Sequence, residues 1–234
     1  MFVPDWTEFA LDRSSYSANF LAHLRRSWPD RVWPASLDRM SPRLAKLSFY
    51  NNAALLSLTE PDLPAPNERY FLIDDEEAIA LNWTNEPIYI ANERDGMKFT
   101  PTTLIAYAKF FFHMVRGQLG HFIIVESPDE LLWLSDEARA RGIEEISKKN
   151  IEMGPVTYRG LDSTGELHVL HSHVQFKNAL FKTDIYVAPY EIDIIDKELG
   201  APEHFTLGQL KLTNEDCLLE NLDVRVDPPP GEFG

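Results

Sequence analysis

Three of the chain's seven histidines fall in one short stretch, Gly165–Phe176, which reads GELHVLHSHVQF. His171 and His173 lie two residues apart, so a β-strand would place both imidazole rings on one face. Imidazole nitrogen is a common ligand of zinc and iron. The stretch therefore predicts a strand and offers His171 and His173 as candidate ligands of one divalent transition metal.

Two imidazoles are too few for a typical zinc or iron site, so other side chains would have to converge on the pair. The nearest candidates along the chain are His204 and the carboxylates of Asp184 and Glu191. His204 is accordingly the third candidate metal ligand.

The apolar pattern of this stretch also fits a structural role. Leu167 and Val169 share the odd-numbered face, whereas Val174 and Phe176 lie on the even-numbered face. This change of face predicts a bulge or bend near residues 170–173, with the histidines facing solvent. Replacing either histidine would then change stability by no more than about 0.5 kcal/mol.

Gly165, five intervening residues and then His171-Ser172-His173 resemble the opening of the first cupin motif. In cupins this motif supplies metal ligands inside a small β-barrel, so the resemblance implies a metal-dependent enzyme or sensor. The chain departs from the motif afterwards: Lys177 and Asn178 stand where it places a glutamate, and Lys211 stands where the second motif has a histidine.

The overall composition bounds the class of protein. The chain has 234 residues, 44% hydrophobic and 25% charged, with a formal net charge of -15. Such acidity argues against nucleic acid and against an anionic membrane surface as partners. The single cysteine, Cys217, excludes an internal disulfide, and the first residues lack the features of a signal peptide. We therefore expect a soluble, cytoplasmic protein.

The N-terminal residues are aromatic and comparatively basic. Residues 1–46 carry seven basic and five acidic side chains, in contrast to the acidic remainder. Tryptophan and arginine are favoured in protein interfaces, which makes Trp28, Arg31 and Trp33 candidate binding residues for a protein partner. The alternative is a helical flap packed on its own body.

The expected fold class is α+β. Residues 1–65 form a helical N-terminal segment, in which one helix stops at Pro29 and another runs from Ser41 to Leu58. Residues 66–226 form a mixed sheet with a central β-α-β portion and a C-terminal antiparallel meander, and residues 227–234 form a disordered tail.

Within this body we expect a hairpin over 87–99 and helices over 101–115 and 128–150. Ser127 caps the second helix and Gly142 interrupts it. Strands are expected at 121–126, 156–160, 166–176, 180–188 and 191–195, and a short helix after Thr213.

The helix that begins after Thr100 is apolar over most of its circumference, which predicts a buried central helix. His113 lies near its end and Arg116 just beyond it. A buried histidine with a hydrogen-bonded partner is one interpretation. The other is a small-molecule pocket beside this helix, with His113 and Arg116 as binding residues.

The chain lacks the glycine-rich nucleotide motifs, the nucleophile elbow and the Cys-x-x-Cys pair of common enzymes. We therefore expect a soluble cytosolic, non-catalytic binding or protein-interaction domain that uses no cofactor. Its partner would be a protein or a small molecule, and its oligomeric state stays open. The alternative is a metal-dependent, cupin-like enzyme or sensor that uses His171 and His173.

Overall fold

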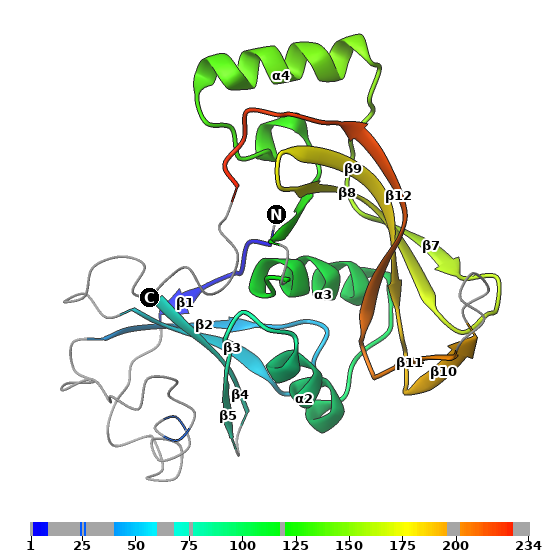
Figure 1. The fold of residues 1–234 in the computed structure, drawn as a ribbon. Helices are drawn as coiled ribbons and strands as arrows, with labels where there is room; N and C mark the ends of the chain where they lie inside the picture. Colours follow the sequence, from blue (N-terminus) through cyan, green and yellow to red (C-terminus); the bar gives the residue numbers. More distant parts are fainter. Residues whose placement is uncertain are drawn as a thin grey trace. The chain divides into compact units, whose positions relative to one another are not determined.

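The computed structural model describes residues 2–8, 24, 26, 40–59, 68–74, 77–117, 120–195 and 202–226. Its α-helices and antiparallel β-sheets confirm the α+β class (Figure 1). The predicted mixed sheet is wrong, because every pairing between the described strands is antiparallel. The predicted tail at 227–234 and most of the predicted helix that stops at Pro29 lie outside the described residues.

The chain divides into two compact units. The N-terminal unit is Val3–Lys98, and the C-terminal unit is Phe99–Gly234 together with Met1–Phe2. Among the described residues, the N-terminal unit holds a five-stranded sheet in the order β1-β2-β3-β4-β5 and the helix α2. Their bounds are β1 Thr7–Glu8, β2 Ser41–Lys46, β3 Ala54–Thr59, β4 Glu68–Ile73, β5 Ala78–Ala80 and α2 Glu86–Asp95.

The predicted helix from Ser41 to Leu58 is wrong, because these residues form the β2–β3 hairpin. Leu55, Leu56 and Leu58 are all buried in β3, the middle strand of the sheet. A strand that is covered on both faces has no alternating pattern, so its leucines resemble the apolar stripe of a helix.

The predicted hairpin over 87–99 is also wrong, because α2 occupies most of it. Pro87 stands in the first turn of this helix, where its fixed φ suits helical geometry. Gly96 follows the last helical residue with a φ of 71°. In this stretch Gly96 ends a helix and does not turn a hairpin.

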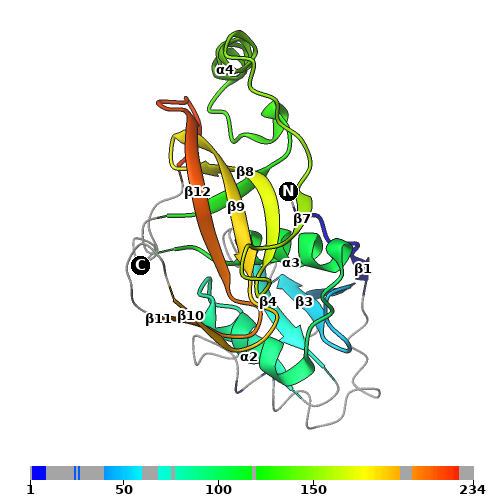
Figure 2. The same cartoon turned by 90° about the vertical axis from the view of Figure 1, so that its right-hand side faces the viewer.

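The C-terminal unit is built on a second sheet with the strand order β12-β9-β8-β6. A further strand of this sheet, β7, also pairs with β8. Figure 2 shows β12, β9 and β8 side by side. The strands are β6 Phe122–Val125, β7 Thr157–Leu161, β8 His168–Phe176, β9 Ala179–Val187 and β12 Leu210–Leu219. A separate pair comprises β10 Ile192–Ile195 and β11 Pro202–Phe205.

The predicted helix after Thr100 is confirmed as α3, Pro101–Met114. The Thr100 hydroxyl accepts a hydrogen bond from the backbone N–H of Thr103, which satisfies one of the amides of the first turn. Seven of its side chains are buried, and it contacts β6 and β7. None of the described helices is long and apolar enough to span a membrane.

The helix predicted to start after Ser127 begins later. The segment η2, Pro128–Glu130, is a single 3-10 turn, and α4 is Asp136–Lys148 with Ser135 as its N-cap. The predicted cap at Ser127 is wrong, because its side chain makes no capping hydrogen bond, and the Glu130 carboxylate accepts from the backbone N–H of Glu126. The helix α4 continues through Gly142, and the residues after Thr213 belong to β12 and form no helix.

Candidate functional site

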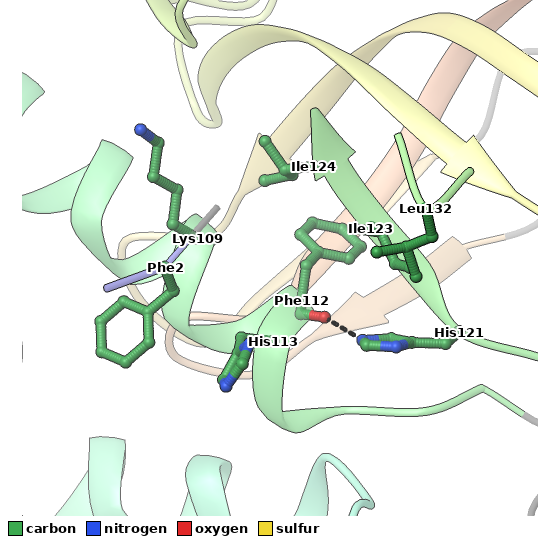
Figure 3. Close-up of a pocket in the computed structure, with 8 residues that line it drawn as sticks. All are labelled: Phe2, Lys109, Phe112, His113, His121, Ile123, Ile124 and Leu132. Atoms are coloured by element: carbon green, nitrogen blue, oxygen red, sulfur yellow. Dashed lines mark hydrogen bonds between the residues drawn. The ribbon is translucent and has the colours of Figure 1, made fainter. Parts of the chain in front are cut away.

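A cavity of about 170 Å³ lies beside α3 in the C-terminal unit (Figure 3). Its walls are mainly apolar, and its polar side chains are one lysine and two histidines. The lining residues are Phe2, Lys109, Phe112, His113, His121, Ile123, Ile124 and Leu132.

Three side chains of α3 line this cavity because of their spacing along the helix. Lys109, Phe112 and His113 are separated by three and four positions, so they share one face of the helix. The same helix contacts β6, which contributes Ile123 and Ile124. The cavity therefore lies where a helix face meets a short strand.

A buried amide positions the segment on the other side of the cavity. The Gln175 side chain in β8 accepts from the backbone N–H of Leu132 at 3.1 Å and donates to the carbonyl of Arg225 at 3.2 Å. Gln175 is almost fully buried, and a buried amide without partners is strongly destabilising. These hydrogen bonds hold the backbone that carries the Leu132 side chain into the cavity.

The cationic group of the cavity is neutralised by an acid. Lys109 Nζ lies 2.7 Å from Glu126 Oε2, and Glu126 Oε1 accepts from the backbone N–H of Val156 at 2.9 Å. Partial burial alone would raise the pKa of Glu126, but the hydrogen bonds from Lys109 and Val156 outweigh it and hold the pKa below its usual value. The Glu126 carboxylate therefore stays ionised at neutral pH.

The histidine before β6 is oriented by the helix. His121 Nε2 lies 2.6 Å from the carbonyl oxygen of Phe112, which can only accept, so Nε2 carries the proton (Figure 3). In the neutral ring Nδ1 is then an acceptor. The His113 ring lies 5.7 Å from the ring of Phe2.

The structure places one of the predicted binding residues in this cavity, His113. Arg116 follows α3 and is half-buried, but it does not line the cavity. Trp28, Arg31 and Trp33 lie outside the described residues. The sequence reasoning missed the other seven lining residues. The helical spacing of Lys109, Phe112 and His113 is the signal that could have found two of them.

The histidine strand forms as predicted, and the rings of His171 and His173 lie 6.2 Å apart between centroids. His171 Nδ1 lies 2.8 Å from Asp184 Oδ1. His204 belongs to β11, where its Nδ1 lies 2.9 Å from Asp193 Oδ1. Within the described ranges, no three His, Cys, Asp or Glu side chains lie together in a way that could hold a metal ion.

The predicted bend is wrong, and of the two histidines His173 does not face solvent. β8 pairs with β9 in an unbroken register from His168 to Phe176, and His173 is only 6% exposed. The register shift of this region lies in β7, between Tyr158 and Gly160. Residues on both faces of β8 are buried, Val169 and His173 on one face and Leu170 and Val174 on the other, so the apolar residues need not keep to one face.

The burial of His173 predicts that stability falls as the pH is lowered. Burial, and then the positive charges of His171 and Lys182, lower the pKa of His173 below its usual value. In the pH range between the folded pKa and about 6.5, the unfolded chain binds a proton that the folded chain does not. The melting temperature should therefore decline as the pH falls below about 6.5, the usual pKa of a histidine in an unfolded chain.

The decline should be smaller in His173→Gln, since glutamine does not titrate. Burial also lowers the pKa of His168, so part of the pH dependence should remain in this variant. Thermal melts of both proteins across this range measure the difference. Equal slopes for the two proteins would contradict the assignment to His173.

The fold and its cavity define an α+β protein with a small, mainly apolar pocket between a helix and a sheet. No family model, no curated protein and no solved structure matches this chain.

Proposed function

We propose that the protein is a non-catalytic, cytosolic binding protein that holds a small, mainly apolar ligand in the cavity beside α3. The observation that carries the proposal is the chemistry of the cavity wall, which is five apolar side chains with three polar ones. Ligand sites in proteins are typically concave and apolar with a few polar groups that fix orientation. The lone cysteine supports a reducing compartment.

The size of the cavity restricts the ligand to about one ring. Apolar cavities of roughly 150 Å³ take up benzene, and this one has about 170 Å³. A polar substituent on such a ring could pair with His113 or His121, which are two of the three polar side chains in the wall. The proposed ligand class is therefore a single aromatic or alicyclic ring with one polar group.

The polar groups of the cavity favour binding over catalysis. Lys109 is held by Glu126, and His121 is held by the carbonyl of Phe112. Among the described residues that line the cavity, none has a hydroxyl, thiol or carboxylate side chain. A lysine amine can also act as a covalent nucleophile, but only when it is activated, and Lys109 is paired with the Glu126 carboxylate.

Benzyl alcohol is a suitable probe, because it joins one ring to one hydroxyl. Isothermal titration calorimetry should detect its binding to the full chain. Leu132→Trp should weaken this binding by at least about tenfold, a change of roughly 1.4 kcal/mol, because the larger side chain fills the cavity. Leu134→Trp is the matched control, since Leu134 is 66% exposed and lies only two residues away.

Circular dichroism melts would show that both variants fold. A second variant, Ile123→Ala, enlarges the cavity and should retain binding. The proposal is overturned if the wild-type protein does not bind benzyl alcohol, or if Leu132→Trp and Leu134→Trp bind it equally well.

A further inference from the structure

A second hollow, of about 610 Å³, lies on the C-terminal unit and shares no lining residue with the cavity beside α3. It extends over β7, β8, β9 and β12 and is walled by the segment that follows α4. We call this hollow the histidine groove, because His171 and His173 line it. Its larger size and polar wall suit a different ligand from that of the apolar cavity.

The register of the sheet places side chains of neighbouring strands next to one another in this groove, among them His171, His173 and Lys182. His173 stands opposite Lys182, and Lys182 stands opposite Asp216 on the next strand. Thr157 stands opposite His171 in the same way. Residues directly opposite one another in antiparallel strands share a face, so these side chains form rows on one face of the sheet.

A β-bulge brings an arginine to the same groove. The pairing between β7 and β8 shifts between Tyr158 and Gly160, which leaves Arg159 as the extra residue. Gly160 has a φ of 104°, a conformation that favours glycine. Bulges often redirect side chains beside functional sites, and Arg159 lines the groove.

The charge of the groove opposes that of the whole protein. Lys149, Arg159 and Lys182 line it with the two histidines, whereas its acidic lining residues are Glu152 and Asp216. The chain as a whole has a formal net charge of -15. Positive side chains gathered in a hollow of an acidic protein favour an anionic ligand, because the groove attracts anions that the negatively charged remainder of the surface repels.

One histidine of the groove is oriented by a fixed carboxylate. Asp184 Oδ2 accepts from Asn214 Nδ2 at 2.9 Å, and Asp184 Oδ1 bonds His171 Nδ1. Because a carboxylate only accepts, His171 carries a proton on Nδ1 and has Nε2 as the nitrogen for a ligand. When Nε2 is protonated as well, Asp184 stabilises the resulting imidazolium beside an anion.

We propose that the histidine groove binds a small phosphorylated molecule, with Arg159, Lys182 and His171 contacting the phosphate. These three side chains line the groove from three neighbouring strands, an arrangement that suits the several oxygens of a tetrahedral anion. Arginine and lysine are the usual phosphate ligands in proteins. The remaining volume of the groove accommodates the organic part of the ligand.

The probe is inorganic phosphate, titrated into the full chain at low ionic strength. Amide and imidazole NMR shifts should change along β7, β8 and β9, while sodium chloride at equal ionic strength should leave them unchanged. Arg159→Gln and Lys182→Gln should each weaken binding by about tenfold or more. Both side chains are exposed, so the variants should fold.

The matched controls are Lys177→Gln and Lys148→Gln. Each removes one positive charge, as Lys182→Gln does, but neither residue lines the groove. Both controls should change the affinity by less than about twofold, because exposed charges at a distance are screened. Lys182→Arg keeps the charge and should bind phosphate nearly as well as the wild-type protein.

Two outcomes overturn the proposal. One is the absence of phosphate-specific shifts in the wild-type protein. The other is equal weakening by Lys182→Gln and Lys177→Gln, which would indicate a general effect of net charge. Leu132→Trp should bind phosphate normally, so a failure of this proposal is distinguishable from a failure of the apolar site.

Discussion

Gly142→Ala is expected to destabilise the C-terminal unit by about 2–3 kcal/mol, although alanine is the better helix former. A Cβ at this position of α4 would lie 2.0 Å from Cη2 and 2.3 Å from Cζ3 of Trp133. The indole cannot easily move, because its Nε1 donates to the carbonyl of Pro128 at 2.8 Å. The overlap therefore outweighs the gain of about 1 kcal/mol in helix propensity.

Urea denaturation of the single and double variants measures this effect. Trp133→Leu removes the atoms that a Cβ would meet, so Gly142→Ala should be much less destabilising in that background than in the wild type. Ser147→Ala is the control for helix propensity, because Ser147 is exposed on the same helix. A higher midpoint for Gly142→Ala in the wild-type background would contradict the packing argument.

The sequence predicted best those elements whose local signals agree. Thr100 and Pro101 start α3, and its apolar positions continue for several turns. The strands β8 and β9 were likewise predicted to within a few residues. In each case the capping residue or the apolar pattern and the final burial indicate the same element.

The errors arose where one apolar run suits two elements. The leucines of β3 are spaced as on a helix, and only the neighbouring strands of the sheet show that they are buried on both faces. The α4 start was misplaced because two serines, Ser127 and Ser135, both precede acidic residues. Tertiary contacts decide between such alternatives, and a single sequence does not contain them.

The site was predictable only in its local part. The helix beside the cavity and His113 follow from the spacing along α3, but Phe2 and Leu132 reach the cavity from distant parts of the chain. The same face for His171 and His173 follows from strand periodicity. Asp184, by contrast, could only be named as one of several nearby carboxylates, because the register of β8 against β9 selects it.

A single strand, β8, supports both proposed sites. Gln175 fixes the backbone of Leu132 at the apolar cavity, and His171 and His173 line the histidine groove. These three residues occupy every second position of the strand, so their side chains lie on the same face of it. Substitutions in β8 that disturb the strand itself should therefore affect both sites, whereas Leu132→Trp and Lys182→Gln each affect one.

The second large effect is expected in the N-terminal unit, at the end of α2. The Asp95 carboxylate accepts from the backbone N–H groups of Asn51 at 2.8 Å, Asn52 at 3.0 Å and Ala53 at 3.1 Å. These bonds join the turn between β2 and β3 to the helix. Asp95→Ala removes the carboxylate and should lower the free energy of unfolding by about 2 kcal/mol. The loss is no larger because the three amides lie next to solvent and can bind water instead.

The position of Asp95 on the helix makes this test specific. A negative charge at a helix C-terminus is unfavourable by roughly 0.3–1 kcal/mol, so an acid there without such partners would gain stability when replaced. Glu93 lies two residues earlier on α2 and is exposed. Glu93→Ala should therefore change stability by no more than about 0.5 kcal/mol, which makes it the matched control.

The contribution of Asp95 should disappear in acid. Partial burial alone would raise its pKa, but the hydrogen bonds from Asn52, Ala53 and Asn51 outweigh it and lower the pKa below its usual value. Its stabilisation is thus complete above about pH 4, near the pKa of the unfolded chain, and is lost as the pH falls through the lower folded value. Urea titrations of the wild type and Asp95→Asn should differ by a constant amount from pH 7 to 5 and converge below pH 4. A difference that persists unchanged at pH 2 would show that the carboxylate charge is not what holds the turn to the helix.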